Sequence, residues 1–465
     1  MAETRREKDF LGEVEVPAEA YYGAQTQRAV MNFPISGLRA HPEFVRAMAR
    51  IKKAAAIANR EAGRLPADVA GAIIAAAEEV IQGQHVHEFV VDVFQAGAGT
   101  SFHMNMNEVI ANRAGEILGE PRGTYRRIHP NDHVNLGQST NDVFPTAMRL
   151  AALALAKPLM TALEAASAAF GRKAREMARV VKSGRTHLQD ATPLTLGQEF
   201  GAYAAALTKS CEAIARVAND LCRLGIGGTA VGTGLTTHPG YRQRVIEELA
   251  KMTGDPLEPA PDTFEAMQSM APFARLSGEL RALALELTRI CNDLRLLASG
   301  PNTGLAEITL PPVQPGSSIM PGKVNPVICE CMNMICFQVI GNDLTIAMAT
   351  QAGQLELNVM MPVINFNLLQ SLEIMDKGLR MLTEKCVTGI TPDVRRCRHY
   401  AQTSLALATL LKTRLGYHKA SELAREAITT GKGIGDLVVE KGLMSREELE
   451  ELLSPEALDP DHPQA

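Results

Sequence analysis

Apolar residues recur along much of the chain with the period of an α-helix. Alanine-rich amphipathic stretches over about 145–180, 197–223 and 326–350 predict three long helices. A fourth helix is predicted where leucine and isoleucine recur at spacings of three and four over three heptads, at Leu276, Leu280, Leu283, Leu287, Ile290, Leu294 and Leu297. Long helices with such stripes pack as a bundle, and a seam this regular also suits helices from several subunits.

Breaks in this pattern divide the chain into three parts. A mixed, mostly helical region over 1–140 precedes a long-helix bundle over 141–392, and a small helical region over 393–465 follows. Gly389-Ile390-Thr391-Pro392 is a turn signal at the second boundary. Aromatic residues make up only 4 % of the chain and tryptophan is absent, which favours helix over sheet. We therefore expect a mainly α protein.

Composition narrows the class of protein. Of the 465 residues, 46 % are hydrophobic, and the formal net charge is only −5 with both signs interspersed, so nothing indicates nucleic-acid binding. The charged N-terminus does not resemble a signal peptide, and no run of 18 apolar residues predicts a membrane span. The eight cysteines fall mostly in apolar helical runs, as reduced core thiols do. We expect a soluble cytoplasmic protein without a membrane or nucleic-acid partner.

The segment Gly316–Pro326 carries the most informative chemistry. It places Ser317 and Ser318 near Lys323 on a Gly/Pro-rich loop that leads into a helix. Asn325 is a good N-cap and Pro326 a good first helical residue, so the helix is predicted to begin there. Free N–H groups at its N-terminus and the ammonium of Lys323 would together stabilise an anion, including a serine alkoxide. An ordinary surface loop before a helix is the alternative.

Four other segments between helical runs are rich in glycine and small polar residues: 97–101, 129–142, 184–190 and 225–234. Hydroxyl and amide groups bind carboxylate oxygens without a metal. Each segment also has a structural explanation. Thr100 and Ser101 could cap a helix that starts near Phe102, Asn141 could be a turn residue, and His187 could be a core histidine.

Neither a metal nor an organic cofactor is predicted. His85, His87 and His103 have no carboxylate or cysteine at ligand spacing. The glycines of 225–234 have no preceding strand and lack the dinucleotide-binding spacing, so they are expected to form an interhelical loop.

Taken together, these segments resemble the fumarase/aspartase superfamily of lyases. The resemblance runs nearly end to end, from Leu11-Gly12 to the helical tail. Gly316–Pro326 matches the superfamily signature G-S-S-x-M-P-x-K-x-N at every fixed position, and Gly184–Asp190 and Gln138–Asp142 match two further blocks. The resemblance implies a mainly α, three-domain protomer whose long central helices form a twenty-helix core in a homotetramer. It also implies active sites that form where three subunits meet.

The family chemistry is anti elimination from a small succinate-like dicarboxylate, which releases fumarate through an aci-carboxylate intermediate. The resemblance implies that Ser317 is the general base, on a mobile loop, and that Lys323 and Asn325 bind the β-carboxylate. Glu330 would orient His187. It also implies that the α-carboxylate and the leaving group are held by Thr100, Ser139, Thr140 and Asn141, and that Thr186 and His187 line the opposite side. Two further expected substrate-binding residues are Ser101 and Ser318.

Two leaving groups compete. The segments 97–101 and 138–142 favour elimination of ammonia from L-aspartate. Gly322 and the segment 227–230 favour the alternative, reversible hydration of fumarate, and Met361 departs from both patterns. We expect ammonia elimination. A structural protein that has lost the chemistry is a third alternative, which the intact Ser317, Lys323 and Asn325 disfavour.

Overall fold

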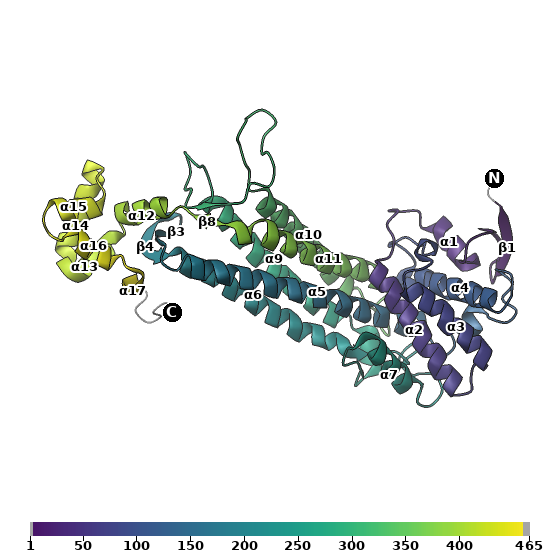
Figure 1. Ribbon diagram of the computed structural model, residues 1–465. Coiled ribbons are helices and arrows are strands. Elements are labelled where there is room, and N and C mark those ends of the chain that lie inside the picture. Colours follow the sequence, from purple (N-terminus) through teal and green to yellow (C-terminus); the bar gives the residue numbers. More distant parts are fainter. Residues whose placement is uncertain (1–2, 459–465) are drawn as a thin grey trace. The chain divides into compact units, whose positions relative to one another are not determined.

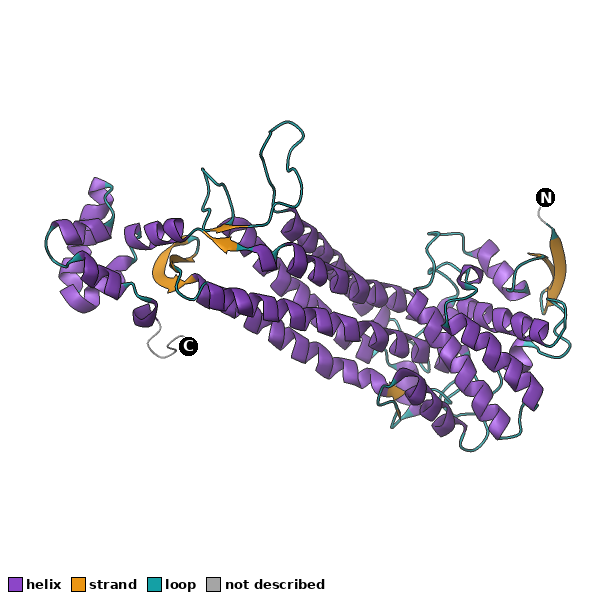
Figure 2. Cartoon of the chain, in the orientation of Figure 1, coloured by secondary structure: helices purple, strands orange, loops and turns teal. Residues whose placement is uncertain are grey.

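The computed structural model describes residues 3–458, which form long helices with a few short strands (Figures 1 and 2). The helices are α1 (Ala24–Asn32), α2 (Pro42–Glu61), α3 (Ala67–Ile81), α4 (Thr100–Ile117), α5 (Thr140–Glu176), α6 (Leu196–Ala218), α7 (Tyr241–Thr253), α8 (Thr263–Gln268), α9 (Ala271–Leu297), α10 (Val327–Gln351), α11 (Met361–Lys385), α12 (Val394–Thr403), α13 (Leu407–Leu415), α14 (Tyr417–Thr430), α15 (Ile434–Glu440), α16 (Arg446–Leu452) and α17 (Pro455–Leu458).

The strands pair only two at a time within residues 3–458. Three pairs are antiparallel and the pair β5·β6 is parallel. The strands are β1 (Thr4–Asp9), β2 (Gly12–Pro17), β3 (Val181–Thr186), β4 (Gln189–Thr195), β5 (Arg223–Leu224), β6 (Glu258–Pro259), β7 (Ile308–Thr309) and β8 (Thr391–Pro392). The predicted mainly α fold is confirmed.

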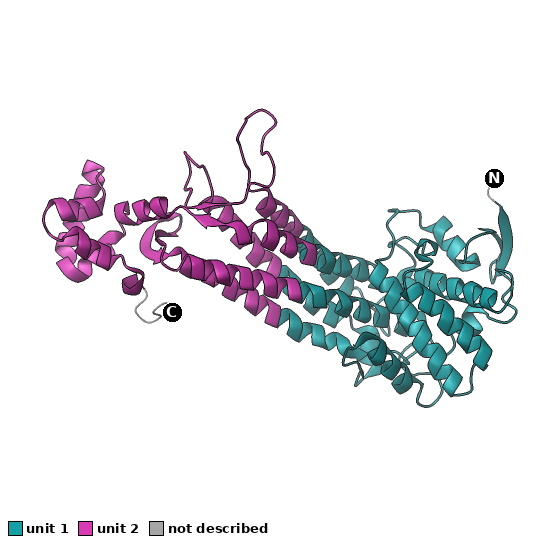
Figure 3. Ribbon diagram, viewed as in Figure 1, with its two compact units in different colours: residues 1–160, 213–282, 338–375 teal, residues 161–212, 283–337, 376–465 magenta. Residues whose placement is uncertain are grey.

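The chain forms two compact units (Figure 3). Unit 1 comprises the described residues within 1–160, 213–282 and 338–375. Unit 2 comprises those within 161–212, 283–337 and 376–465. Each of the helices α5, α6, α9, α10 and α11 has residues in both units. The division into domains at 140 and 392 stays a prediction.

The predicted long helices are present, with shifted ends. The stretch 145–180 lies mostly within α5, which begins at Thr140, and 326–350 corresponds to α10. The stretch 197–223 contains α6, but the helix ends at Ala218 and a short 3-10 turn leads into β5. All seven residues of the heptad seam on α9 are at most 4 % exposed in the single chain. The seam therefore packs in the core of its own chain and is not left free for another subunit.

Two helices are long and apolar enough to cross a membrane by length and composition alone, α5 and α10. Half of the most apolar 18-residue stretch of α5 is buried inside the protein. A core helix of a soluble protein passes the same test, so the expectation that no segment spans a membrane stays a prediction.

Residues 407–453 have an apolar core of their own. Leu407, Leu411, Leu423, Ile434 and Val438 are each at most 1 % exposed and pack together with other buried apolar residues of this region. Ser445 forms a capping box with Glu448 at the start of α16, which satisfies two backbone N–H groups there.

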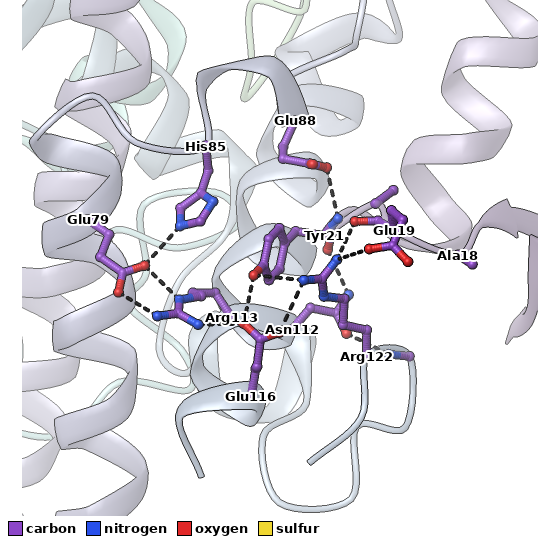
Figure 4. Close-up of polar contacts among 12 residues, drawn as sticks. Ala18, Glu19, Tyr21, Glu79, His85, Glu88, Asn112, Arg113, Glu116 and Arg122 are labelled. Atoms are coloured by element: carbon purple, nitrogen blue, oxygen red, sulfur yellow. Dashed lines mark hydrogen bonds and ion pairs between the residues drawn. The ribbon is translucent and has the colours of Figure 1, made fainter. Parts of the chain in front are cut away.

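An ionic network ties the N-terminal segment to α4 in unit 1 (Figure 4). Arg113 on α4 donates to both carboxylate oxygens of Glu79 on α3, at 2.7 and 2.8 Å. Tyr21 donates its hydroxyl to Glu116 at 2.6 Å, and the guanidinium of Arg122 lies 3.9 Å from the centre of the Tyr21 ring. Partial burial opposes ionisation of Glu116, but hydrogen bonds from Tyr21, Arg113 and Arg122 outweigh it and lower its pKa to about 2.

This pKa gives a pH-dependent stability. A carboxylate whose pKa falls on folding stabilises the protein above its unfolded pKa, and that stabilisation is lost as the pH falls toward the folded pKa. We expect Glu116→Gln to lower the urea midpoint at pH 7, and the gap from the unsubstituted protein to close between about pH 4.5 and pH 2. Glu212→Gln, at an exposed position, is the control. A gap that stays constant over this range would contradict the assignment.

Candidate active site

The loop Gly316–Pro326 lies in unit 2 and is closed at its base by its own residues. The Gly316 N–H donates to the Lys323 carbonyl at 2.7 Å, and Asn325 Nδ2 donates to the Gly316 carbonyl at 2.7 Å. A Cβ on Gly316 would lie 2.7 Å from the Asn325 nitrogen, so the closure requires glycine. The prediction that Asn325 caps the helix is wrong. Its side chain is used in the loop, and α10 begins at Val327, one residue later than expected.

Ser317 has the environment of an activatable hydroxyl. Its Oγ accepts hydrogen bonds from the N–H groups of Ile319 at 3.2 Å and Met320 at 3.0 Å. Both donors would stabilise negative charge on this oxygen. Ser317 and Lys323 line the same solvent-open cavity, and Ser318 beside them is half-buried. The loop therefore presents a hydroxyl, an ammonium and backbone donors to one space.

Thr186 and His187 lie at the tip of the β3–β4 hairpin in unit 2. Thr186 pairs with Gln189, which leaves His187 and Leu188 as a two-residue turn with φ of +56° and +59°. Such turns favour asparagine and glycine because other residues are strained at positive φ. Both Thr186 and His187 are exposed, so His187 is not a core histidine.

A buried carboxylate that the sequence did not reveal pairs with two cations of strand β3 in this hairpin. Glu307, just before β7, is fully buried and accepts from both terminal nitrogens of Arg185, at 2.8 and 3.1 Å. Lys182 lies 3.4 Å from the same carboxylate and 2.9 Å from Glu199. A buried charge must be paired, and these pairs fix β3 against the segment that leads to the serine loop, Gly316–Pro326.

Thr100 and Ser101 lie at the start of α4 in unit 1. The helix begins at Thr100, two residues before Phe102, and Gly99 is its N-cap residue. The Gln95 side-chain oxygen accepts from the Phe102 N–H at 2.9 Å. Thr100 is exposed and Ser101 half-buried. A Cβ on Gly99, at φ +82°, would lie 2.0 Å from the Phe144 ring, so only glycine fits there. The hydroxyls are therefore not needed for capping.

Ser139, Thr140 and Asn141 form the start of α5 in unit 1. Asp142 accepts from the Ser139 N–H at 2.9 Å, and Ser139 Oγ accepts from the Asn141 N–H at 3.2 Å. This reciprocal arrangement is a variant of the capping box. Asn141 Nδ2 donates to the Ala230 carbonyl at 2.8 Å. The residues considered as possible turn formers thus build a helix N-terminus, and Ser139 to Asn141 are all half-buried there.

Asp142 also holds the loop 225–234 in place. Its second oxygen accepts from the N–H groups of Gly227 at 2.9 Å and Thr229 at 3.0 Å. Complete burial raises the pKa of Asp142 to about 6, against the backbone donors and the nearby charge of Lys52, which lower it. Sequence pattern alone did not assign Asp142 this role.

The predicted residues therefore fall into two sets. Thr100, Ser101 and Ser139–Asn141 belong to unit 1, whereas unit 2 holds Thr186, His187, Ser317, Ser318, Lys323, Asn325 and Glu330. Within the described part of the chain, His187 and Glu330 share neither a hydrogen bond nor an ion pair. Of the three histidines considered for a metal, His85 pairs with Glu79 and His103 with Lys52, while His87 lies beside Glu88.

Comparison with known proteins gives the class. A protein-family model described as Lyase matches residues 12–341, and one described as Fumarase C C-terminus matches residues 407–458. A crystal structure of a fumarate lyase:delta crystallin from Brucella melitensis bound to cobalt has a TM-score of 0.94 at 49 % identity, covering 97 % of this chain and 99 % of that one. The chain belongs to the fumarase/aspartase superfamily of lyases.

The similar proteins include enzymes of two kinds. An aspartate ammonia-lyase from a Bacillus species is 50 % identical over 97 % of both chains. A class II fumarate hydratase from Ralstonia nicotianae is 47 % identical, over 98 % of this chain and 99 % of that relative.

The geometry at Asp142 predicts a loss of stability on substitution. Asp142→Asn keeps the shape but turns one acceptor into a donor that faces backbone N–H groups. We expect the free energy of unfolding at pH 7 to fall by about 1–3 kcal/mol, measured by urea denaturation. Asp132→Asn, at a largely exposed aspartate, should change it by less than about 0.5 kcal/mol. Equal effects would contradict the role of Asp142.

Proposed function

We propose that the protein is an aspartate ammonia-lyase, which reversibly eliminates ammonia from L-aspartate to give fumarate. The observation that carries this proposal is the 50 % identity to an aspartate ammonia-lyase over 97 % of both chains. The segments 97–101 and 138–142 have the aspartase-like pattern and also support it. Their residues Thr100, Ser101 and Ser139–Asn141 lie exposed or half-buried at the starts of α4 and α5.

The difficult step is removal of a weakly acidic Cβ proton beside a carboxylate. It creates a second negative charge on that carboxylate, so catalysis requires groups that bind the intermediate more tightly than the substrate. Ser317 is the proposed general base. The donors from Ile319 and Met320 support this role because they would stabilise its alkoxide, and the nearby ammonium of Lys323 would add to the effect.

The other proposed roles divide the dicarboxylate between two kinds of group. Lys323 and Asn325, with Ser318 and the loop N–H groups, would bind the carboxylate on which charge accumulates. The remaining carboxylate and the amino group would be held by Thr100, Ser101, Ser139, Thr140 and Asn141. An ammonium departs as neutral ammonia without a strong acid, so Thr186 and His187 are proposed to line and orient rather than to supply an essential proton.

Fumarate hydratase is the second candidate function. The similarity to the Ralstonia nicotianae fumarate hydratase and the presence of Gly322 favour it. A hydroxide leaving group needs a proton, which His187 oriented by Glu330 would supply.

A homotetramer with active sites shared among three subunits is part of the proposal. The α10 helix supports it with exposed apolar side chains at Met334, Phe337, Leu344 and Met348, each at least 57 % exposed in the single chain. A row this apolar on one helix is typical of a subunit interface. His187 and Glu330 would then pair between subunits, since they do not pair within the described chain. We also propose a cytoplasmic location.

The function can be tested by following fumarate absorbance with L-aspartate and, separately, with L-malate. We expect turnover of L-aspartate, whereas turnover of L-malate alone would favour the hydratase. Ser317→Ala should lower kcat by about 10²- to 10⁴-fold, the usual contribution of a general base. Ser421→Ala, on α14, is the control and should leave kcat unchanged. A Ser317→Ala variant that keeps substantial activity would contradict the mechanism.

A further inference from the structure

A fully buried lysine lies behind the start of α5 in unit 1. Lys52 on α2 is 0 % exposed, and its Nζ lies 2.6 Å from His103 Nε2, 2.8 Å from Gln138 Oε1 and 3.2 Å from Asn135 Oδ1. An ammonium group has three N–H donors and no acceptor. The three neighbours therefore match the donors of a charged Lys52 one for one.

The neighbouring amides are oriented by their other hydrogen bonds. Gln138 Nε2 donates to the carbonyls of Val134 at 3.0 Å and Leu136 at 3.3 Å, so the Gln138 oxygen faces Lys52. Asn135 Nδ2 donates to the Gln138 carbonyl at 3.3 Å, which turns its oxygen the same way. With both oxygens as acceptors, Lys52 uses its third N–H toward His103.

This arrangement decides which ring nitrogen of His103 carries the proton. Burial, with the positive charge of Lys52, holds the pKa of His103 well below its usual value, so the ring is neutral and has one N–H. If Nε2 accepts from Lys52, the proton is on Nδ1. Nδ1 lies 2.7 Å from Thr140 Oγ1 and so donates to it.

The state of Thr140 follows from the state of His103. When the Thr140 oxygen accepts from Nδ1–H, its own O–H proton is free to point elsewhere. A neutral Lys52 could instead accept from Nε2–H. Nδ1 would then accept from Thr140, and the hydroxyl would present only lone pairs. A carboxylate is bound by the first arrangement and repelled by the second.

We infer that Lys52 and His103 are positioning residues that hold the Thr140 hydroxyl as a hydrogen-bond donor to a substrate carboxylate. This inference rests on the proposed function, in which Thr140 touches the dicarboxylate. Two further titratable groups belong to the surroundings: the carboxylate of Asp142, which favours the charged form of Lys52, and the buried Tyr241 near Asp142. Burial holds the pKa of Lys52 well below its usual value, and the charge of the Asp142 carboxylate opposes that effect. The one-for-one match between the three N–H donors of an ammonium and the three neighbouring acceptors is the geometric ground for a charged Lys52.

A double-mutant cycle on the full-length protein tests the inference. Lys52→Met and Thr140→Val should each raise KM for L-aspartate by about tenfold, the effect of one hydrogen bond to a charged group, and change kcat much less. The double variant should resemble Thr140→Val within about twofold, because Lys52 acts through the hydroxyl. Lys173→Met removes another largely buried lysine, paired with Glu176, and should leave KM unchanged.

If KM of the double variant rises about a hundredfold, the product of the two single effects, the inference is overturned. Lys52 would then act independently of Thr140. An unchanged KM in Lys52→Met would overturn it as well.

A second measurement does not depend on the folding of Lys52→Met or on activity. In the unsubstituted protein with nitrogen-15 histidine, the His103 ring should show a protonated Nδ1 and an unprotonated Nε2, assigned by their shift in Thr140→Val. A proton on Nε2 would overturn the inference. If the unsubstituted protein releases no fumarate from L-aspartate, the proposed function fails, while this spectrum still reports on the arrangement at His103.

Discussion

Two ionisable groups that are wholly enclosed in unit 1, Asp142 and Lys52, constrain everything around the start of α5. A buried ionisable group is tolerated only when its hydrogen-bonding capacity is used. Asp142 and Lys52 both have partners at hydrogen-bond distance. Asp142 joins the first turn of α5 to the loop 225–234 through backbone N–H groups. Lys52 joins α2 to α4 and to the segment before α5. Asp142 accepts from the Ser139 N–H, and His103, which lies beside Lys52, is 2.7 Å from the Thr140 hydroxyl.

The serine loop in unit 2, in contrast to the start of α5, is exposed and depends on hydrogen bonds among its own residues. It projects as a long loop between β7 and α10 (Figure 1), and Lys323 and its neighbours Ile319–Val324 are exposed. Its internal hydrogen bonds join Gly316 to Lys323 and Asn325, and the N–H groups of Ile319 and Met320 donate to Ser317 Oγ. Few buried contacts tie it to the helices, which is the condition under which a segment can open and close locally. Its base is fixed by a glycine-dependent closure, while its tip is free of packing.

The apolar residues of α9 and those of α10 have different surroundings. The heptad seam of α9 is buried within the single chain, so it contributes to the core of the protomer. The apolar row of α10 is left exposed on a helix that begins directly after the serine loop. This apolar row is the surface on which the proposed subunit interface depends.

The helical class, the approximate extent of α5, α9 and α10, and the serine loop with its lysine could be predicted from the amino-acid sequence. These features depend on local periodicity and on a contiguous motif, which are visible in one dimension. The three-domain division, the pairing of His187 with Glu330 and the subunit arrangement stay predictions.

The partners of the polar residues became visible only in the folded chain. Asn325 closes the loop instead of capping α10, Gln95 accepts from the Phe102 N–H at the start of α4, and His187 occupies a strained turn. Two of the partners of Asp142, Gly227 and Thr229, lie 85 and 87 residues away, and those of Lys52 are 51 to 86 residues away. A buried charge selects its partners by three-dimensional proximity, and no spacing along the chain records that choice.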